Sequence, residues 1–446
     1  MAKRIVILGG GESGVGAALL ARKMGYEVFV SDSQLVARPF REEMQLHGIA
    51  FEENGHTEEL ILNASEIIKS PGIPEKAAII LKIRQQNIPI IGEMEFGYRY
   101  MGKSKLVAIT GSNGKSTVTS LLFHICITAG LDCAMVGNIG FSFARQIAVA
   151  PSPLYIAEIS SFQLDDTIEF RPHIAILLNI TEDHLDRYDY KMDNYIASKF
   201  SITKNQQPED FFIYCADDPV TKQNINNFSI FSNPTSFSMK QSESHGAYIK
   251  DKEMLLKLRE EEVRMNINDF ALKGKHNQYN TMAASIASSI LDIRSTKIRD
   301  AITSFEGLEH RNEKVATIRG VEYINDSKAT NINSTWFALE NMDKPVVLIL
   351  GGVDKGNDYS LIEELVEEKV RAIICLGMDN NKIHEALKQT GKELIDVTTM
   401  TDAVKVAYKI AEKGDVVLLS PACASFDLFK NYEDRGKQFK NAVIEL

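Results

Sequence analysis

The chain has 446 residues, with 60 acidic against 50 basic side chains and a formal net charge of −10 at pH 7. That balance argues against a general nucleic-acid binder, which needs a basic face, but it leaves room for local phosphate pockets. The hydrophobic share of 44% and the charged share of 25% are those of an ordinary globular protein. The length is enough for about three domains.

The cysteines and the apolar runs indicate the compartment. The five cysteines show no paired metal-ligand spacing, so we interpret them as reduced thiols. No run approaches the ~18 apolar residues that are needed to span a membrane. The N-terminus starts like a signal peptide, with Lys3 and Arg4, but glycines follow the apolar residues 5–8 directly. We expect a cytoplasmic protein with no membrane span, acting as a monomer and not binding nucleic acid.

The first segment opens with a glycine-rich turn. Residues 4–8 predict a strand, residues 9–16 read Gly-Gly-Gly-Glu-Ser-Gly-Val-Gly, and a helix is expected to about residue 24. A second strand, at 27–30, ends at Asp32, which completes the Rossmann arrangement of strand, turn, helix, strand and acid. By itself this pattern leaves three interpretations open: a site for any nucleotide diphosphate, an NAD site, or a purely structural turn. A further short strand, at 67–69, leads into Ser70.

The second segment is organised around residues 106–117, Leu-Val-Ala-Ile-Thr-Gly-Ser-Asn-Gly-Lys-Ser-Thr. The apolar run predicts a buried parallel strand, the glycines a turn that closes around phosphate oxygens, and residues 118–127 a helix. Lys115 adds a cation, and Ser116 and Thr117 add hydroxyls for Mg²⁺. The spacing departs from the usual P-loop, because Ile109 stands where a glycine is expected. We interpret the stretch as a nucleoside-triphosphate site; the alternative is an ordinary glycine-rich turn.

Two more predicted strands end in polar residues. The strand at 154–157 leads into Glu158, a suitable oxygen ligand for Mg²⁺, and the strand at 173–178 leads into Asp183 and His184. A solvated Glu158 and a structural His184 are the plainer alternatives. Lys199 falls on a predicted helix, where a solvated lysine is the default. Residues 224–262 predict short strands and loops without chemistry, and a helix is expected at 282–291.

The third segment repeats the alternation of strand, loop and helix. Strands are expected at 346–350, 372–376 and 416–419, and a helix from residue 333. The predicted fold class is therefore α/β, with parallel sheets in all three segments. We place the domains at residues 1–98, 99–306 and 307–446.

Five polar motifs occur along the chain: residues 111–117; 158–164 (Glu-Ile-Ser-Ser-Phe-Gln-Leu); 179–186; 274–280; and His310 with Arg311. Their order and approximate spacing resemble those of the Mur ligases, the ATP-dependent amide-forming enzymes of bacterial peptidoglycan precursor synthesis. Residues 325–331 and 420–427 are similar to the branch that adds D-glutamate. The Asp-Asn-Pro-Arg signature of the branch that adds diaminopimelate or lysine is absent from the sequence.

The resemblance implies three α/β domains: an N-terminal Rossmann-like domain that binds UDP, a central P-loop-type ATPase domain and a C-terminal Rossmann-like domain. It implies an ATP site at Gly111, Ser112, Asn113, Gly114, Lys115, Ser116, Thr117, Asn277, Arg311 and Asp326. The implied catalytic residues are Lys115, Glu158, His184 and Lys199. The implied ligands of Mg²⁺, present as two ions, are Ser116, Thr117, Glu158, His184 and Lys199, the last as a carbamylated lysine.

The resemblance also implies the two other substrate sites. The UDP-substrate would contact Ser13, Gly14, Asp32, Ser33, Ser70, Pro71, Gly72, Asn138 and His184. D-Glutamate would contact Lys328, Thr330, Lys355, Ser425, Phe426 and Tyr432. Tyr432 stands where the family often has phenylalanine.

The implied activity is ATP-dependent addition of D-glutamate to UDP-N-acetylmuramoyl-L-alanine, through an acyl phosphate and a tetrahedral intermediate. Two alternatives remain at this stage. One is a Mur-type ligase, or a recycling ligase on the same scaffold, with another amino-acid specificity. The other is a redox protein that uses the first glycine-rich turn for NAD, although such a protein has no need of a second phosphate loop. A non-enzymatic scaffold fits least well with so many polar strand ends.

Overall fold

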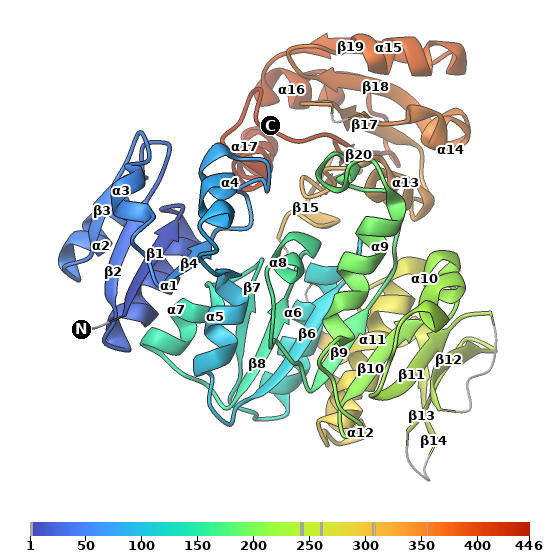
Figure 1. Cartoon of the computed structure of the whole chain (residues 1–446). Helices are drawn as coiled ribbons and strands as arrows, with labels where there is room; N and C mark the ends of the chain where they lie inside the picture. Colours follow the sequence, from blue (N-terminus) through green and yellow to red (C-terminus); the bar gives the residue numbers. More distant parts are fainter. Residues whose placement is uncertain (1–2, 241–244, 259–261, 306, 308, 355) are drawn as a thin grey trace. The chain divides into compact units, whose positions relative to one another are not determined.

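The computed structural model describes residues 3–240, 245–258, 262–305, 307, 309–354 and 356–446. The chain forms two compact units, one of Met1–Leu272 with Asn277–Phe305 and one of Lys273–His276 with Glu306–Leu446. In the described part of the chain, the first unit contains two sheets and the second unit contains one (Figure 1).

The first sheet has five parallel strands in the order β3-β2-β1-β4-β5. Its central strand is a continuous apolar run, because helices cover both faces of a parallel sheet of this kind. Its strands are β1 (Arg4–Leu8), β2 (Glu27–Ser31), β3 (Ala50–Glu52), β4 (Glu66–Lys69) and β5 (Ile90–Gly92), and its helices are α1 (Glu12–Lys23), α2 (Arg38–Leu46), α3 (Glu58–Ile61), α4 (Ala78–Gln85) and α5 (Glu93–Tyr100).

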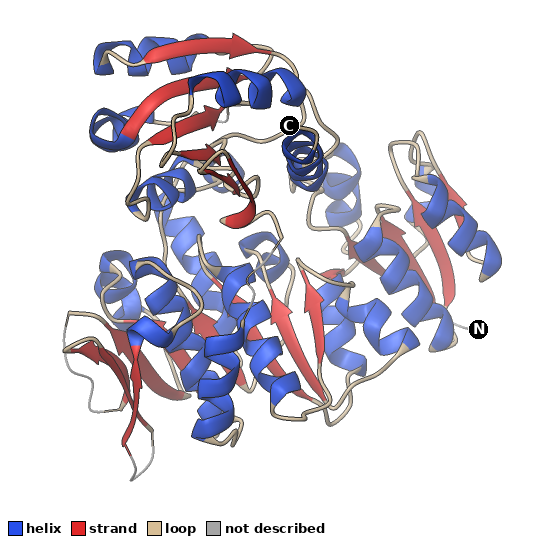
Figure 2. Ribbon diagram, turned by 180° about the vertical axis from the view of Figure 1, so that it is seen from behind, coloured by secondary structure: helices blue, strands red, loops and turns tan. Residues whose placement is uncertain are grey.

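The second sheet has nine strands in the order β14-β13-β12-β11-β10-β9-β6-β8-β7. Helices lie in front of it in Figure 1 and again in Figure 2, which views the molecule from behind, so both faces are covered. Its strands are β6 (Lys105–Thr110), β7 (Ala134–Gly137), β8 (Leu154–Glu158), β9 (Ile174–Leu177), β10 (Phe211–Cys215), β11 (Asn233–Ser238), β12 (Gly246–Lys250), β13 (Glu253–Lys257) and β14 (Glu262–Asn266). Its helices are α6 (Lys115–Thr128), α7 (Phe143–Val149), α8 (Ser161–Asp165), α9 (Met192–Phe200), α10 (Pro219–Asn224), α11 (Lys275–Ile290) and α12 (Ser295–Ser304).

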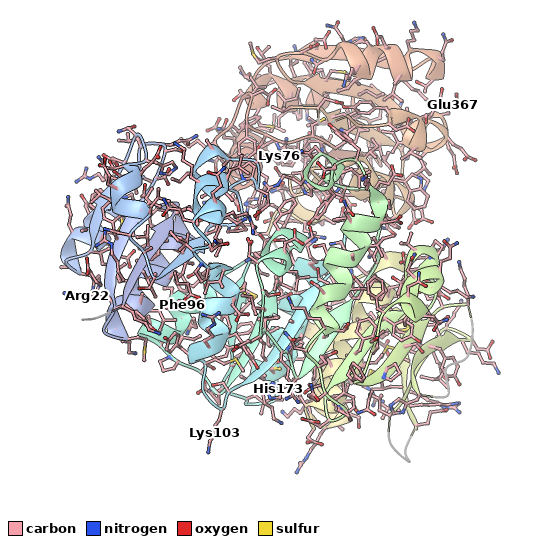
Figure 3. All side chains as sticks on the ribbon, viewed as in Figure 1. Arg22, Lys76, Phe96, Lys103, His173 and Glu367 are labelled. Atoms are coloured by element: carbon pink, nitrogen blue, oxygen red, sulfur yellow. The ribbon has the colours of Figure 1, made fainter. Side chains whose placement is uncertain are left out.

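Helix α7 joins the two sheets of the first unit, because it packs against both α1 and α5. The aromatic residue Phe96 of α5 is 1% exposed and meets the rings of Tyr26 and Tyr100 edge-on (Figure 3). One buried cluster of apolar side chains runs from the first sheet into the second. The two sheets of this unit therefore share a core.

The second unit has a six-stranded sheet in the order β15-β16-β20-β17-β18-β19. Apolar side chains pack on both faces of it, in two separate clusters. Its strands are β15 (Glu313–Ile318), β16 (Val321–Asn325), β17 (Val346–Leu350), β18 (Val370–Leu376), β19 (Glu393–Val397) and β20 (Val416–Leu419). Its helices are α13 (Ile332–Glu340), α14 (Glu363–Lys369), α15 (Asn381–Leu387), α16 (Met400–Ile410) and α17 (Tyr432–Ile444).

The prediction of wholly parallel sheets is wrong at two places. Strands β12, β13 and β14 pair antiparallel, as do β15 and β16. The first reversal turns at Asp251 and Lys252, both at positive φ, and the second at Arg319 and Gly320, also at positive φ. Two successive residues at positive φ form the tight turn that matches the twist of a hairpin. Neither pair is the Asn-Gly or Asp-Gly that signals such a turn in a sequence.

In the described part of the chain, no helix is long and apolar enough to cross a membrane. The five cysteines are free thiols, in agreement with the prediction.

Candidate active site

The phosphate loop joins β6 to α6, and the helix starts at Lys115 rather than at the predicted residue 118. The reason is Gly114, which caps the helix at φ 88°, so that helical backbone begins immediately after it. A Cβ added to Gly114 would lie 2.5 Å from Asn280 Oδ1, which leaves no room for a side chain. Lys115 Nζ bends back over the loop and donates to the carbonyls of Gly111, at 2.7 Å, and Ser112, at 2.8 Å. The ammonium thus lies beside the helix N-terminus, where an anion would bind.

A second polar segment, after β9, fixes the shape of this loop. Asn179 Oδ1 accepts from the backbone N–H of Asn113 at 2.8 Å, and its amide donates to the Asn113 carbonyl at 3.1 Å. Ser112 Oγ donates to the Thr181 carbonyl and accepts from the Thr181 N–H, both at 2.9 Å. Asn179 and Thr181 are functional neighbours that our residue-by-residue reasoning missed. The available signal was that both directly follow a strand next to β6.

Sheet order brings two of the predicted positions, the phosphate loop and Glu158, together with Asn179. Strand β6 lies between β8 and β9, with Ile109 paired to Glu158 and Thr110 paired to Leu177. The phosphate loop, Glu158 and Asn179 therefore all lie at the carboxyl ends of adjacent parallel strands, where ligands bind in α/β sheets. Glu158 is 1% exposed, and its Oε1 accepts from the amide of Asn138 at 2.8 Å.

The donor set at this edge is suited to Mg²⁺. Ser116 and Thr117 lie in the first turn of α6 and are 2% and 3% exposed. Thr117 Oγ1 is buried and, in the described part of the chain, has no hydrogen-bond partner. Hydroxyl and carboxylate oxygens are hard ligands of the kind that Mg²⁺ takes, together with phosphate oxygens and water. Thr117 and Glu158 therefore fit a magnesium site beside a bound triphosphate.

His184 lies on the loop that follows β9. Its backbone is left-handed, at φ 53°, and it precedes the short 3₁₀ helix η1 (Leu185–Tyr188). Its side chain is 40% exposed, with Nε2 3.5 Å from Asp183 Oδ1, and its ring meets the Phe162 ring edge-on at 5.2 Å. The imidazole is thus oriented by packing and remains accessible to a substrate.

Lys199 is not the solvated lysine that its sequence context predicts. It is 1% exposed on α9, and its Nζ lies 4.6 Å from the centre of the Tyr195 ring. Burial lowers the pKa of the Lys199 ammonium well below its ordinary value, and the charge of Lys115 lowers it further, against the opposing effect of Asp183 and Asp165. Tyr195, one turn earlier on α9, shares a hydrogen bond of 3.1 Å with Ser112 Oγ. Lys199 therefore belongs to the surroundings of the phosphate loop.

A cavity of about 650 Å³ lies at the carboxyl edge of the first sheet. Five of the residues predicted to bind the UDP-substrate line it, namely Ser13, Asp32, Ser33, Ser70 and Gly72. Sequence reasoning missed other lining residues, including Glu12, Gln34 and His56. His56 had no visible signal because it comes from the loop after β3, outside the glycine motif.

Four predicted residues of this group, Gly14, Pro71, Asn138 and His184, do not line the cavity. Gly14 packs on the chain itself, since an added Cβ would lie 1.8 Å from the Gly9 carbonyl oxygen. The Pro71 carbonyl accepts from Arg187 Nη2 at 3.1 Å, and the Gly72 carbonyl accepts from Nη1 of the same residue at 3.2 Å. Asp32 accepts from the backbone N–H groups of Gly10, at 2.6 Å, and Gln34, at 2.8 Å.

In the second unit, Asp326 follows β16 and is 5% exposed. Its carboxylate accepts from Ser420 Oγ at 2.9 Å and from the backbone N–H of Asn312 at 3.2 Å. Burial raises the pKa of Asp326 to about 7, although the nearby Arg311 opposes the rise. Arg311 and Asp326 are thus neighbours, as the prediction of one binding site for both requires.

Asn277, another residue of the predicted ATP site, belongs to the first unit. Its Oδ1 accepts at 3.1 Å from Asn280, whose own Oδ1 borders Gly114. Asn277 is therefore linked to the phosphate loop through Asn280.

The residues predicted to bind D-glutamate follow β16 and β20. Lys328 Nζ lies 5.3 Å from the centre of the Tyr432 ring. Ser425 is 2% exposed and Phe426 is 70% exposed, while Thr330 is half-buried. Lys355 lies outside the described residues.

Arg435, which sequence reasoning missed, holds the two loops together. It is 1% exposed and donates to the carbonyls of Ser327, at 2.8 Å, and Cys423, at 3.1 Å. Burial lowers its pKa to about 10. Arg435 lies on α17, and a lone arginine in the sequence gave no signal for this role.

Comparison with known families matches nearly the whole chain. Residues 3–92 match the N-terminal domain of MurD-like Mur ligases, residues 109–288 the Mur ligase middle domain, and residues 310–423 the Mur ligase glutamate ligase domain. The phosphate loop, the Glu158 edge and three α/β sheets are thus those of a Mur ligase.

Full-length relatives indicate the branch of the Mur ligases to which the chain belongs. The chain is 52% identical over 447 residues to the UDP-N-acetylmuramoylalanine–D-glutamate ligase of Bacteroides fragilis, with 100% of both chains covered. It is 50% identical, with the same coverage, to the enzyme of that name from Christiangramia forsetii. The chain belongs to the UDP-N-acetylmuramoylalanine–D-glutamate ligase family. These matches do not support the alternative of an NAD-dependent redox protein.

Solved structures agree on the fold. The UDP-N-acetylmuramate–alanine ligase of Thermotoga maritima aligns with a TM-score of 0.64 at 18% identity, with 99% of both chains covered. A pseudomurein peptide ligase from Methanothermus fervidus aligns with a TM-score of 0.62 at 20% identity, with the same coverage.

Proposed function

We propose that this chain is an ATP-dependent ligase that joins D-glutamate to UDP-N-acetylmuramoyl-L-alanine in peptidoglycan precursor synthesis. The observation that carries this proposal is the full-length match to ligases of that name, at 50–52% identity, on a chain whose phosphate loop lies beside Glu158. The proposed domains are residues 1–98 for the UDP-substrate, 99–306 for ATP and 307–446 for the amino acid. Action in the cytoplasm as a monomer stays a prediction.

The proposed reaction has two steps. The L-alanyl carboxylate attacks the γ-phosphorus of ATP, ADP leaves, and an acyl phosphate forms. The free amine of D-glutamate then attacks the acyl carbon, and the tetrahedral intermediate collapses to the amide and inorganic phosphate. The first step joins two anions, so Lys115 lowers the repulsion between them and neutralises charge that develops on the transferred phosphoryl group.

Thr117 and Glu158 would hold magnesium, which would supply further positive charge beside the phosphates. We propose two ions, with His184 and Lys199 contributing to the second. A lysine reacts with CO₂ only as the neutral amine, and the lowered pKa of Lys199 favours that form. Its amine would add to CO₂ with loss of one proton, and the resulting carbamate would be an anionic oxygen ligand.

The amino-acid pocket would use Lys328 for a carboxylate of D-glutamate and the buried hydroxyl of Ser425 as a second donor. Tyr432, beneath Lys328, would restrict where that ammonium lies. The cavity at the carboxyl edge of the first sheet would hold the uridine diphosphate, near the N-terminus of α1.

The test is ATP-dependent phosphate release in the presence of UDP-N-acetylmuramoyl-L-alanine. D-Glutamate, L-glutamate, a diamino acid and no amino acid are compared at equal concentration. We expect release with D-glutamate alone. Release with another amino acid would keep the reaction and overturn the specificity, while no release with any of them would overturn the ligase assignment.

Carbamylation is tested separately, by ¹³C NMR of the protein in ¹³C-bicarbonate. We expect a carbamate signal that disappears in Lys199→Ala and persists in Lys204→Ala, which removes an exposed lysine five residues further along the chain. A signal that persists in Lys199→Ala, or no signal in the unaltered protein, would contradict the assignment.

A further inference from the structure

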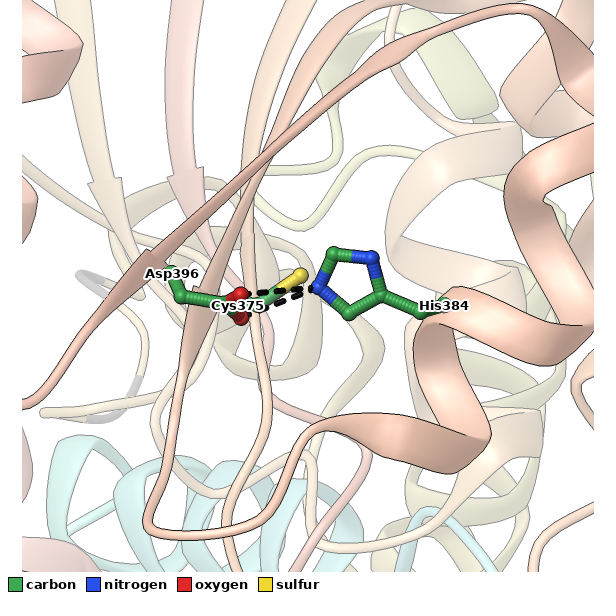
Figure 4. A group of neighbouring side chains, drawn as sticks. All are labelled: Cys375, His384 and Asp396. Carbon is green, nitrogen blue, oxygen red and sulfur yellow. Dashed lines mark hydrogen bonds and ion pairs between the residues drawn. The ribbon is translucent and has the colours of Figure 1, made fainter.

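A cysteine, a histidine and an aspartate converge in the second unit, in the α/β layer built from β18, β19 and α15 (Figure 4). Cys375 on β18 is paired in register with Asp396 on β19, so their side chains are cross-strand neighbours on one face of the sheet. His384 comes from α15, and its Nε2 lies 3.0 Å from both carboxylate oxygens of Asp396. The Cys375 sulfur, His384 nitrogen and Asp396 oxygen all lie within 4.8 Å of one another.

These three donors are the mixture that zinc prefers. Zn²⁺ binds thiolate sulfur, imidazole nitrogen and carboxylate oxygen, and takes them in a tetrahedral arrangement. Three protein ligands with a fourth, open position are typical of sites that retain a water molecule. Here Cys375 is fully buried, whereas the side chains of His384 and Asp396 are 39% and 59% exposed. The cluster therefore has a closed side formed by the sulfur and an open side towards solvent.

A neighbouring amide organises two of the three ligands. Asn380, which is 9% exposed, donates from Nδ2 to Asp396 Oδ1 at 2.9 Å and to the Cys375 carbonyl at 3.2 Å. The same residue directly precedes α15, the helix that carries His384. Such outer hydrogen bonds orient ligands in known metal sites.

A second cluster also combines carboxylates with a histidine, but a lysine ammonium already lies between its carboxylates. Glu309, His310 and Glu313 also lie close enough to share a cation. There, however, Lys440 Nζ already donates to both carboxylates, at 3.0 Å from Glu309 and 2.6 Å from Glu313. For Asp396 the ion pair found in the described part of the chain is with His384, whose nitrogen can act as a metal ligand.

We propose that Cys375, His384 and Asp396 form a binding site for Zn²⁺ or a similar thiophilic divalent cation, with water as the fourth ligand. On binding, the thiol releases its proton to solvent as the sulfur–metal bond forms, and neutral His384 binds through Nε2. The ion would tie the edge strand β19 and helix α15 to β18. This site is independent of the magnesium chemistry at Glu158, whose ligands are hard oxygens.

The experiment uses the full chain, stripped of metal and titrated with Co²⁺ and then with Zn²⁺. Four-coordinate Co²⁺ with one thiolate gives strong visible bands and a sulfur-to-cobalt charge-transfer band in the near ultraviolet. We expect both with the unaltered protein, and we expect Zn²⁺ to displace them at one equivalent. Absence of the charge-transfer band at saturating Co²⁺ would overturn the proposal.

Variants test which residues bind the ion that gives the charge-transfer band. Cys375→Ser should abolish it, His384→Ala should weaken Zn²⁺ affinity by about tenfold or more, and Asn380→Ala should weaken it by about 10–100-fold. Cys423→Ser removes another buried thiol of the same unit and should keep the band, as should Glu158→Gln. His384 is exposed, so its variant remains informative even where a core substitution disturbs folding. A band that survives both Cys375→Ser and His384→Ala would place the metal elsewhere and overturn the site.

Discussion

Two loops in the first unit are built to the same plan but carry opposite charge. Each follows the first strand of its sheet, turns on glycines and opens a helix, α1 in one case and α6 in the other. In the first loop a carboxylate, Asp32, accepts the backbone N–H of Gly10, and α1 begins with Glu12. In the second loop an ammonium, Lys115, donates to two loop carbonyls, and two hydroxyls follow it.

The difference shows that a glycine-rich turn indicates only that an anion can approach a helix N-terminus. What the turn then does depends on the side chains around it. At the first loop the Asp32 carboxylate already accepts the N–H groups of Gly10 and Gln34, which suits a ligand with hydroxyl and ring groups to hold beside its diphosphate. Lys115 and the hydroxyls of α6 suit the transfer of a highly charged phosphoryl group with Mg²⁺.

Removing the charge of the second loop should have the largest effect. Lys115→Ala should lower kcat by about 10³-fold or more, because it removes a cation from the charge that develops during phosphoryl transfer. Binding of UDP-N-acetylmuramoyl-L-alanine, measured by calorimetry, should change little, since the first loop is intact. Lys103→Ala, which removes an exposed lysine just before β6 (Figure 3), is the control and should keep full activity. Near-normal turnover in Lys115→Ala would contradict the assignment of the loop.

A methyl group added to each loop should separate their steric requirements. Gly114→Ala places a Cβ 2.5 Å from Asn280 Oδ1 on a backbone at φ 88°, whereas Gly11→Ala meets nothing within 4 Å on an extended backbone. The left-handed conformation alone costs about 1–2 kcal/mol for a residue with a Cβ. We expect kcat/KM for ATP to fall about 10–100-fold in Gly114→Ala and to stay within about twofold in Gly11→Ala. Equal losses in both variants would show that the two turns are equally constrained.

Much of this arrangement could be predicted from local sequence. The strands at residues 4–8 and 346–350 match the observed bounds, because buried parallel strands are continuous apolar runs with clear ends. The positions of Glu158 and His184 after strands followed from the same signal. The antiparallel hairpins could not be predicted, because Asp251-Lys252 has no glycine, Arg319-Gly320 lacks the Asn or Asp that usually precedes the glycine, and only the pairing reveals them.

Local sequence could not predict which polar side chains are buried or which distant residues they contact. Lys199 lies among helix-favouring residues, and only packing against Tyr195 makes it a buried amine. Asn179 and Arg435 act through partners far away in the sequence, at Asn113 and Ser327. Such roles depend on which strands are neighbours, and no local periodicity contains that information.

Arg187 tests whether the two loops act independently. Its guanidinium donates to the carbonyls of Pro71 and Gly72 beside the first cavity, and it lies 4.5 Å from the centre of the Phe162 ring, which packs against His184. We expect Arg187→Ala to raise KM for the UDP-substrate and to lower kcat, with a combined loss of about tenfold in kcat/KM, because misplacement of a positioned group is costly. KM for ATP should stay unchanged.

The control for Arg187 is Lys76→Ala, which breaks the exposed ion pair between the same two segments, Lys76 with Asp189. An exposed pair of this kind contributes little, so this variant should behave like the unaltered enzyme. Arg187→Lys keeps the charge but not the bidentate contact with the two carbonyls, so it should restore only part of kcat/KM. A change in kcat or KM no larger than that of Lys76→Ala would show that the two loops are not coupled through Arg187.

The smallest effect is expected at Glu93 of α5, which contacts α7 where the two sheets of the first unit meet. Burial, and the charge of Glu12 from the first loop, both affect the pKa of Glu93. Its buried carboxyl accepts from the backbone N–H of Ala144, and burial, reinforced by the charge of Glu12, raises its pKa to about 7. The folded protein therefore holds a proton that the unfolded chain releases near pH 4.5, so the free energy of unfolding falls as pH rises through the interval between these values. Glu93→Gln is neutral throughout and should remove that part of the slope, seen as a higher apparent Tm at pH 8 but not at pH 5.

Glu95→Gln is the matched control for that variant, because Glu95 is also buried but accepts three backbone N–H groups, from Ile168, Glu169 and Phe170, and pairs with Arg99. Replacing it removes an ion pair and weakens those hydrogen bonds, so Tm should fall at both pH values. A fall at both pH values in Glu93→Gln as well would mean that Glu93 is held as a carboxylate. The charge of Glu12 would then not keep Glu93 protonated, and the acidic charge of the first loop would have no effect beyond the loop itself.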